Sequence, residues 1–286
     1  MGSAHQGLGR EIRVNTDYVQ RFLFENLDIR GRLVCLTGAW HRMLEGRGYP
    51  PKITELLGHT TALAVLFGAN QKGKSRVTLQ VQGSGPVRLL VADCTSELKI
   101  RGMAQYADRA GKLLGEGRLA LTLEDVASGQ IYQSLVPLQG ETLAAIFEHY
   151  LAQSEQLPAF LRLHADGEAL CGLLLEKLPG ADSRDSDGWD RVTALAATLE
   201  LVETVNVQPY DILVKLFPEE LLRVFRLYPV EYHCPYDEEN VKRMLRGLGR
   251  KEVESILAEQ GEVRIRNEIC NHEYRLDRKA VEALFA

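Results

Sequence analysis

Two short segments near the C-terminus carry the residues of this chain best suited to metal or redox chemistry. The first reads Tyr232-His233-Cys234-Pro235-Tyr236-Asp237, and the second reads Asn267-Glu268-Ile269-Cys270-Asn271-His272-Glu273-Tyr274. Each segment has one cysteine and one histidine. Small zinc modules are built in this way, because each half supplies two ligands on a tight turn and the metal replaces a core that so short a segment cannot form.

The pattern holds only half of a full zinc motif, however. A complete module would read C-x-C in the first segment and C-x-x-C in the second. Tyr236 stands where the second cysteine of the first pair would be, and Asn267 stands where the first cysteine of the second pair would be.

Three interpretations of Cys234 and Cys270 remain open at this point. They could be unreactive thiols packed in a small core. They could close a single disulfide, which would stabilise the folded segment by about 3–4 kcal/mol. They could also bind zinc weakly together with His272; His233 is a poorer ligand because it is adjacent to Cys234. No cofactor is therefore expected, and zinc is the one candidate that these residues leave open.

Without a metal, the C-terminal segment must be held together by ordinary packing. We expect Tyr236 to contribute a large buried aromatic surface, since its bulky ring stands where the second cysteine of a complete C-x-C pair would be. The expected core consists of Tyr232, Tyr236, Val241, Leu245, Val253, Ile256, Ile265, Tyr274 and Leu284.

The composition is that of a globular protein, with 286 residues, 45% hydrophobic and 26% charged residues, and a net charge of −5. This mild acidity argues against nucleic-acid binding through an overall basic field. The apolar runs are too short to span a membrane, and the N-terminus does not read as a secretory signal. Five cysteines form no export-type disulfide framework, so a cytoplasmic location is expected.

The elements that must position these segments are mostly alternating strands with a few helices. Strand patterns recur between residues 30 and 177, and helices are expected over Ile53–Phe67 and Glu141–Ser154. This predicts an α+β fold with an antiparallel-sheet main domain and packed helices. The expected divisions are a flexible tail (1–16), the main domain (17–178), a linker of amphipathic helices (179–230) and a small α+β module (231–286).

The remaining cysteines and histidines favour structural roles. Cys35, Cys94 and Cys171 lie in strand patterns among apolar neighbours, where nothing nearby would lower a thiol pKa. Four histidines stand outside any recognisable motif: His41, His59, His149 and His164.

Several long strings of residues resemble one known family. They include Gln20-Arg21-Phe22-Leu23-Phe24-Glu25-Asn26, Tyr49-Pro50-Pro51, Leu79-Gln80-Val81-Gln82-Gly83, Leu89-Leu90-Val91-Ala92-Asp93-Cys94-Thr95, Gln153-Ser154-Glu155-Gln156-Leu157-Pro158 and Leu216-Phe217-Pro218-Glu219-Glu220. The chain resembles, over nearly its whole length, the redox-regulated bacterial chaperones known as the thirty-three-kilodalton heat shock protein.

The resemblance implies a stress-induced holdase that binds unfolding proteins without ATP and usually forms dimers. In that family four thiolates hold one zinc ion. Oxidation forms two disulfides, releases the metal, unfolds the module and frees the linker helices, which exposes apolar surface. The implied partners are partly unfolded proteins and a second copy of the chain, with no membrane and no specific nucleic acid, and no enzymatic activity is implied.

This chain departs from the family at the switch. Since Cys234 and Cys270 keep only two of the four ligand positions, neither four-thiolate zinc nor a two-disulfide switch can form. We therefore expect thermal loosening of the module, or constitutive activity, in place of activation by oxidant. The expected client-binding residues are the apolar stripes of the linker: Val192, Leu195, Leu199, Ile212, Leu213 and Leu216.

Two alternative functions are weaker. A zinc-ribbon-like nucleic-acid or ribosome binder would use the basic residues of the module (Arg243, Arg246, Arg250, Lys251, Arg264 and Arg266), but Glu252, Glu254 and Glu262 are interspersed among them. A thiol-based redox enzyme using Cys234 or Cys270 would need a depressed thiol pKa.

Overall fold

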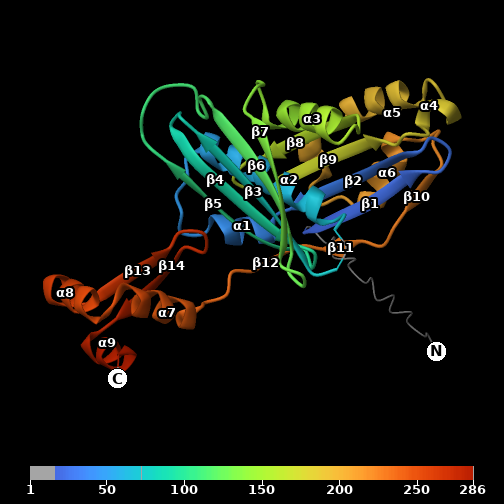
Figure 1. Cartoon of the computed structure of the whole chain (residues 1–286). Helices are drawn as coiled ribbons and strands as arrows, with labels where there is room; N and C mark the ends of the chain where they lie inside the picture. The colour runs from blue at the N-terminus through green and yellow to red at the C-terminus, as the bar shows by residue number, and fades with distance from the viewer. Residues whose placement is uncertain (1–16, 72, 286) are drawn as a thin grey trace, which may run out of the picture.

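A computed structural model of the chain describes residues 17–71 and 73–285 (Figure 1). The flexible tail expected at 1–16 lies outside these residues. Within the described part of the chain, no helix is both long enough and apolar enough to cross a membrane.

The first of two large sheets, sheet A, has the strand order β10-β1-β2-β9-β8, and β11 also pairs with β1. Its strands are β1 (Tyr18–Phe24), β2 (Ile29–Leu36), β8 (Ala159–Ala165), β9 (Leu170–Lys177), β10 (Leu222–Val224) and β11 (Tyr228–Pro229). All of these pairings are antiparallel, so short connections suffice between consecutive strands.

The second large sheet, sheet B, has the order β12-β5-β4-β3-β6-β7. Its strands are β3 (Ser75–Gly83), β4 (Val87–Thr95), β5 (Lys99–Tyr106), β6 (Gly117–Asp125), β7 (Gln130–Pro137) and β12 (Glu231–Tyr232). The short strand β12 pairs in parallel with β5, whereas the other pairings of this sheet are antiparallel.

Helix α2 (Pro51–Gly68) lies between the two sheets and contacts strands of both. It begins with proline at its first position, where the missing N–H costs nothing. Most of its residues are buried, because sheet covers it on two sides, and the amphipathic pattern of a surface helix is weak. Helix α1 (Gly38–Leu44) precedes it, and α3 (Leu143–Ser154) packs on β8 and β7.

Sheet A is buried on both faces, and successive residues of its central strands belong to different cores. On β2, Val34 and Leu36 pack with α2, whereas Leu33 and Cys35 pack on the opposite side. Because strand side chains alternate between faces, a sheet covered on both sides reads as a continuous apolar run. The same holds on β1, where Val19 packs with α2 and Phe22 packs on the opposite side.

The linker supplies the layer that covers the second face of sheet A (Figure 1). It consists of α4 (Ala181–Arg184), α5 (Gly188–Ala197), the 3-10 turn η1 (Leu201–Thr204) and α6 (Pro209–Leu216). The chain then returns to sheet A, because β10 and β11 both pair with β1.

The C-terminal module extends from one end of the body (Figure 1). It contains α7 (Glu238–Leu248), α8 (Arg250–Gln260), the hairpin β13 (Val263–Asn267) and β14 (His272–Leu276), and α9 (Arg278–Leu284). Asp237 caps α7 by accepting from the N–H of Asn240 at 3.0 Å, and Gly261 ends α8 in the left-handed conformation (φ 78°).

These antiparallel sheets with packed helices confirm the predicted α+β fold class. The expected domain limits remain predictions. The linker, predicted to carry amphipathic helices, also contains the strands β10 and β11.

Candidate functional site

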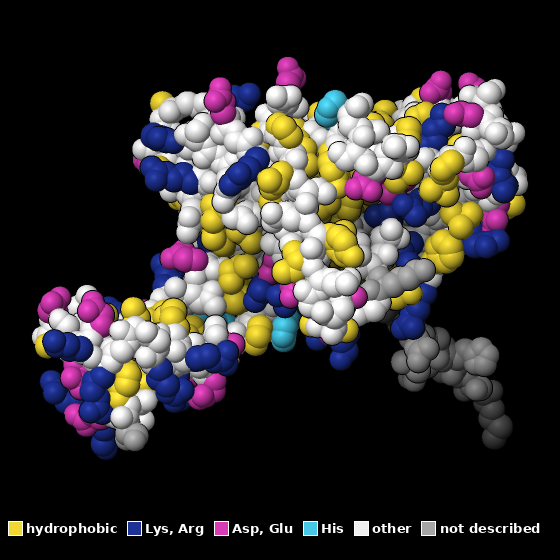
Figure 2. Space-filling view, in the orientation of Figure 1, with side chains coloured by type: hydrophobic (Ala, Val, Ile, Leu, Met, Phe, Trp, Pro, Cys, Tyr) yellow, Lys and Arg dark blue, Asp and Glu magenta, His cyan; other side chains and the backbone are white. Residues whose placement is uncertain are grey.

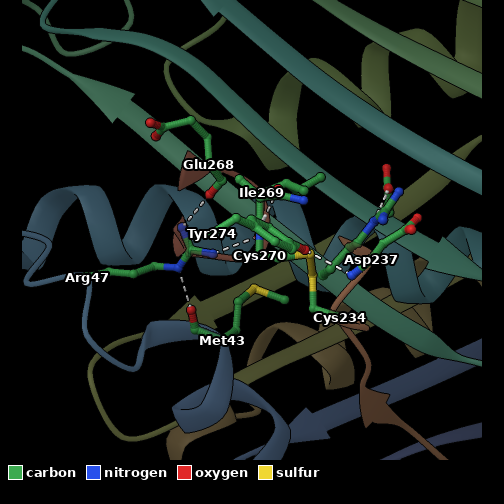
Figure 3. Close-up of a disulfide and its surroundings, with 11 residues drawn as sticks. Met43, Arg47, Cys234, Asp237, Glu268, Ile269, Cys270 and Tyr274 are labelled. Atoms are coloured by element: carbon green, nitrogen blue, oxygen red, sulfur yellow. Dashed lines mark hydrogen bonds and ion pairs between the residues drawn. A yellow bond between two sulfur atoms is a disulfide. The ribbon is translucent and has the colours of Figure 1, made fainter. Parts of the chain in front are cut away.

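A disulfide joins the two cysteines of the module (Figure 3). Cys234 precedes α7, and Cys270 lies in the turn of the β13–β14 hairpin, with their Cα atoms 5.5 Å apart. That separation lies within the range that a disulfide requires. Of the three interpretations left open by the sequence, the structure has the disulfide.

The turn that presents Cys270 is shaped by the two flanking asparagines. The side-chain oxygen of Asn267 accepts from the N–H of Cys270 at 3.2 Å, and Asn271 has a positive φ of 55°. Asparagine suits both tasks, since its short amide bonds to nearby backbone and tolerates the left-handed region. Asn267 therefore shapes the turn at the position where a complete C-x-x-C pair would have its first cysteine.

Tyr236 stands where a complete C-x-C pair would have its second cysteine, and here the predicted burial was wrong. Its side chain is 58% exposed, although its ring stacks on that of Tyr274 with centroids 4.3 Å apart. Tyr274 is the buried partner, and its hydroxyl accepts from the N–H of Asp237 at 2.9 Å. Tyr236 thus covers the core of the module from outside and does not fill it.

The core of the module is aliphatic apart from Tyr274. Tyr232 was expected in it but packs instead against the core between the two sheets. The buried residues of the module core are Val241, Leu245, Val253, Leu257, Val263, Tyr274, Leu276, Val281 and Leu284. So small a core has limited stability of its own, and a cross-link adds to it.

The donor set of the module does not fit a structural zinc ion. Such a site takes four ligands, usually thiolates and imidazoles. Here Cys234 and Cys270 are bonded to each other, and His272, whose Nδ1 is buried without a hydrogen-bond partner, would be a third donor at most. Among residues 17–71 and 73–285, no group of three or more His, Cys, Asp or Glu side chains is placed to hold a metal.

The turn around the disulfide is docked on the main body through Arg47. Its guanidinium donates to the carbonyls of Glu268 at 3.0 Å and Ile269 at 2.7 Å, and also to that of Met43 at 2.8 Å (Figure 3). The side-chain amide of Asn271 donates to the carbonyl of Glu45 at 3.2 Å. This contact could not be predicted from the sequence, because the carbonyls of Glu268 and Ile269 belong to backbone more than 200 residues from Arg47.

Loss of the disulfide is expected to lower the stability of the module by about 3–4 kcal/mol, since the bond closes a loop with a sequence separation of 36 residues. Hydrogen exchange of the β13 and β14 amides, compared with and without reductant, measures this effect. The Cys234→Ser/Cys270→Ser variant is the control, because reductant should leave its exchange unchanged. Equal protection of the reduced and oxidised protein would contradict the expectation.

The linker forms the second part of the candidate site. It packs on an apolar floor, by which we mean the side chains of sheet A on the face away from α2: Tyr18, Phe22, Phe24, Ile29, Leu33, Cys35, Cys171, Leu173 and Leu175. Of the six predicted client-binding residues, four are buried against this floor (Val192, Ile212, Leu213 and Leu216), and Leu195 and Leu199 are partly buried beside them. Val192 and Leu213 are fully buried there, so the proposed binding surface is closed in this conformation.

Charged groups hold the linker at its edge. The guanidinium of Arg191 on α5 bonds to the carboxylates of Glu220 at 2.8 Å and Asp185 at 2.9 Å. These hydrogen bonds raise the pKa of Arg191 above its usual value, and the bond with Glu220 contributes most. On the outer side, a groove of about 420 Å³ lies between α5, η1 and α6 and is lined by apolar and charged side chains, including Leu199, Glu203 and Lys215.

The basic residues of the module are interspersed with acidic ones. Figure 2 shows both signs mixed over its surface. Lys242 pairs with Glu238 at 3.0 Å, and Arg275 pairs with Glu273 at 3.0 Å. Proteins bind nucleic acids mainly through concentrated positive charge, whereas on this surface basic side chains form ion pairs with acidic ones. The surface therefore does not favour a nucleic-acid interface.

Comparison with known proteins identifies relatives over almost the whole chain. The family model described as "Hsp33 protein" matches residues 17–277. A "33 kDa chaperonin" of Methylobacillus flagellatus is 36% identical over 277 residues, covering 94% of each chain. A "33 kDa chaperonin" of Chromobacterium violaceum is 39% identical over 276 residues, again covering 94% of each.

A solved structure shares the fold. The crystal structure of the 33 kDa chaperonin (Heat shock protein 33 homolog) of Thermotoga maritima superposes with a TM-score of 0.81 at 22% identity, covering 94% of this chain and 97% of the other.

Proposed function

The chain belongs to the Hsp33 family of chaperones, and from this premise we propose that it is an ATP-independent holdase that binds unfolding proteins and prevents their aggregation. The observation that carries the proposal is the docked linker. Its apolar stripe and the apolar floor are buried against each other. Release of the linker exposes two apolar surfaces at once, and such surfaces are what an unfolding protein with its own exposed core would bind.

The module controls release through its place in the chain. The linker ends with β10 and β11, and the chain then runs through β12 directly to Cys234. Loosening of the module removes the β12–β5 pairing, which directly follows the linker, and the Arg47 contacts, which dock the turn of the module on the main body. Heat loosens so small a core first, since marginal regions open before the global structure does.

In a switch that unfolds on oxidation, oxidant destabilises the module. Here the single disulfide has the opposite effect, and oxidant stabilises it. Closing the bond between Cys234 and Cys270 leaves the module folded. A native-compatible cross-link stabilises a small domain, so oxidant favours the closed conformation. Reduction and heat together favour the open one.

The remaining parts of the proposal concern setting and partners. Clients are partly unfolded proteins of no particular sequence, since apolar surface is recognised without directional specificity. We place the protein in the cytoplasm as a non-enzymatic chaperone that forms a homodimer. Cys234 and Cys270 are redox-active thiols whose disulfide stabilises the module, and they have no catalytic role.

The test is suppression of light scattering from a heat-denatured client by the reduced protein and by the peroxide-treated protein. We expect suppression by the reduced form to be at least as strong as by the oxidised form. The Cys234→Ser/Cys270→Ser variant, which cannot close the bond, should match the reduced form in both conditions. Activity that is absent in the reduced protein and appears only on oxidation with release of zinc would overturn this account of regulation.

A further inference from the structure

A second cysteine pair lies within sheet A, far from the module in the sequence. Cys35 on β2 and Cys171 on β9 are directly opposite each other in the antiparallel register. Both are free thiols and fully buried, and their sulfur atoms are 2.8 Å apart. Directly opposite residues of antiparallel strands have Cα atoms about 4.5–5.5 Å apart, which is within the range for a disulfide.

The linker is what covers this pair. Both thiols are on the apolar floor, and the turn η1 contacts β9 and β8. The hydroxyl of Thr204, the last residue of η1, donates to the carbonyl of Leu201 at 2.6 Å, lies close enough to both thiols to influence their pKa values, and belongs to a side chain that is 1% exposed. The pair is therefore shielded by the element that the proposed function requires to move.

We propose that Cys35 and Cys171 form a linker-gated dithiol, which a hydroperoxide oxidises to a cross-strand disulfide once η1 has lifted from sheet A. The proposal rests on the proposed function in one respect, namely that the linker detaches. It goes beyond that function by assigning a modification site on the client-binding face itself, separate from the disulfide of the module.

The chemistry is balanced with hydrogen peroxide as the oxidant. The Cys171 thiolate attacks one peroxide oxygen, the O–O bond breaks, and the second oxygen leaves as water after taking up the displaced thiol proton. The Cys35 thiol then attacks the sulfur of the resulting sulfenic acid; the S–S bond forms, the S–O bond breaks, and the oxygen leaves as a second water. Two thiols and one peroxide thus give one disulfide and two waters.

The mutual hydrogen bond divides the roles between the thiols. It lowers the pKa of Cys171, because a thiolate at that position accepts the bond, and it raises the pKa of Cys35, which donates it. The thiolate is the reactive form, so Cys171 is the attacking thiol and Cys35 resolves the sulfenic acid.

The product would lock the centre of the binding sheet. It joins β2 to β9, two strands whose cysteines are 136 positions apart in the sequence. A cross-link over so long a loop restricts the unfolded chain strongly. The cross-link would protect sheet A from unfolding during the time in which its apolar floor lacks the linker.

The test uses the full chain and measures alkylation separately from chaperone activity. Iodoacetamide is pulsed at a resting and at an elevated temperature, and each cysteine is quantified by peptide mass spectrometry. Cys94 is the internal control, because it is equally buried but lies between α2 and sheet B. We expect alkylation of Cys35 and Cys171 to rise at least tenfold on heating while Cys94 stays protected. Hydrogen peroxide added at the elevated temperature should then yield the linked Cys35–Cys171 peptide, and Cys171→Ser should abolish it.

A pair of linker variants tests the gate without heat. Thr204→Ala removes the hydroxyl above the thiols and should speed their alkylation severalfold at rest. Thr198→Ala removes an exposed hydroxyl of the same linker and should not.

Each failure has a distinct meaning. Equal alkylation of all three cysteines, or no selective alkylation at any temperature, would overturn the gating, whatever the light-scattering assay reports about clients. Selective alkylation without a disulfide after peroxide would overturn the oxidation step and leave linker release standing. Selective alkylation with the disulfide, in a protein that does not suppress aggregation, would support the dithiol site and refute the holdase.

Discussion

Replacing Glu176 by alanine is expected to lower the free energy of unfolding by about 3–5 kcal/mol. The carboxylate of Glu176 on β9 bonds to the guanidiniums of both Arg30 and Arg32 on β2, and the side chains of Arg32 and Glu176 are only 3% and 4% exposed. Burial lowers the pKa of Arg32, which shows the cost of holding its charge in this site. Removing Glu176 leaves that buried charge without its partner, which is the costly outcome.

Denaturant unfolding followed by circular dichroism measures this loss, and the matched control is Glu25→Ala. Glu25 also binds an arginine, Arg223, but that arginine is 58% exposed, so the loss should stay below about 1 kcal/mol. The double variant Arg32→Met/Glu176→Leu should recover most of the stability, since it removes both charges and keeps the volume. A loss for Glu176→Ala no larger than that for Glu25→Ala would contradict the argument.

Replacing Leu213 by alanine is expected to open the linker. Leu213 is fully buried at the centre of the contact between α6 and the apolar floor. Truncating a buried leucine costs about 2–5 kcal/mol, which would shift the docking equilibrium toward release by roughly thirtyfold or more. We therefore expect the variant to suppress client aggregation at a temperature at which the unaltered protein does little.

The neighbouring residue provides the control for this second prediction. Val214 belongs to the same helix but is 45% exposed on its outer side, so Val214→Ala should leave both docking and aggregation suppression nearly unchanged. Hydrogen exchange of α5 and α6 amides reports docking directly. A Leu213→Ala protein with unchanged exchange and unchanged suppression would show that the docked linker does not limit activity.

The main elements could be predicted from hydrophobic period, and the exceptions have physical causes. The helix expected over Ile53–Phe67 is α2 (Pro51–Gly68), and the helix expected over Glu141–Ser154 is α3 (Leu143–Ser154). The strands β10, β11 and β12 were missed because they have only three, two and two residues, too few for a period to appear.

The candidate site was predicted less completely than the fold. Tyr236 was expected inside the module because its bulky ring stands where a complete zinc motif would have a cysteine, but the ring stacks on Tyr274 and its side chain is 58% exposed. The sequence placed Cys35 and Cys171 correctly among buried strand residues. It could not show that they face each other, since strand register depends on the pairing of distant segments.

The return of the chain to sheet A after α6 determines what happens to a released linker. The segment leaves the sheet after β9 and rejoins it at β10, so both of its ends stay fixed to the same scaffold. Re-docking is therefore an intramolecular event with an effective concentration on the order of millimolar, and its rate does not depend on the amount of protein. If a client binds the apolar floor as proposed, it competes against this tethered segment at all times, and we expect cooling alone to favour its return to solution.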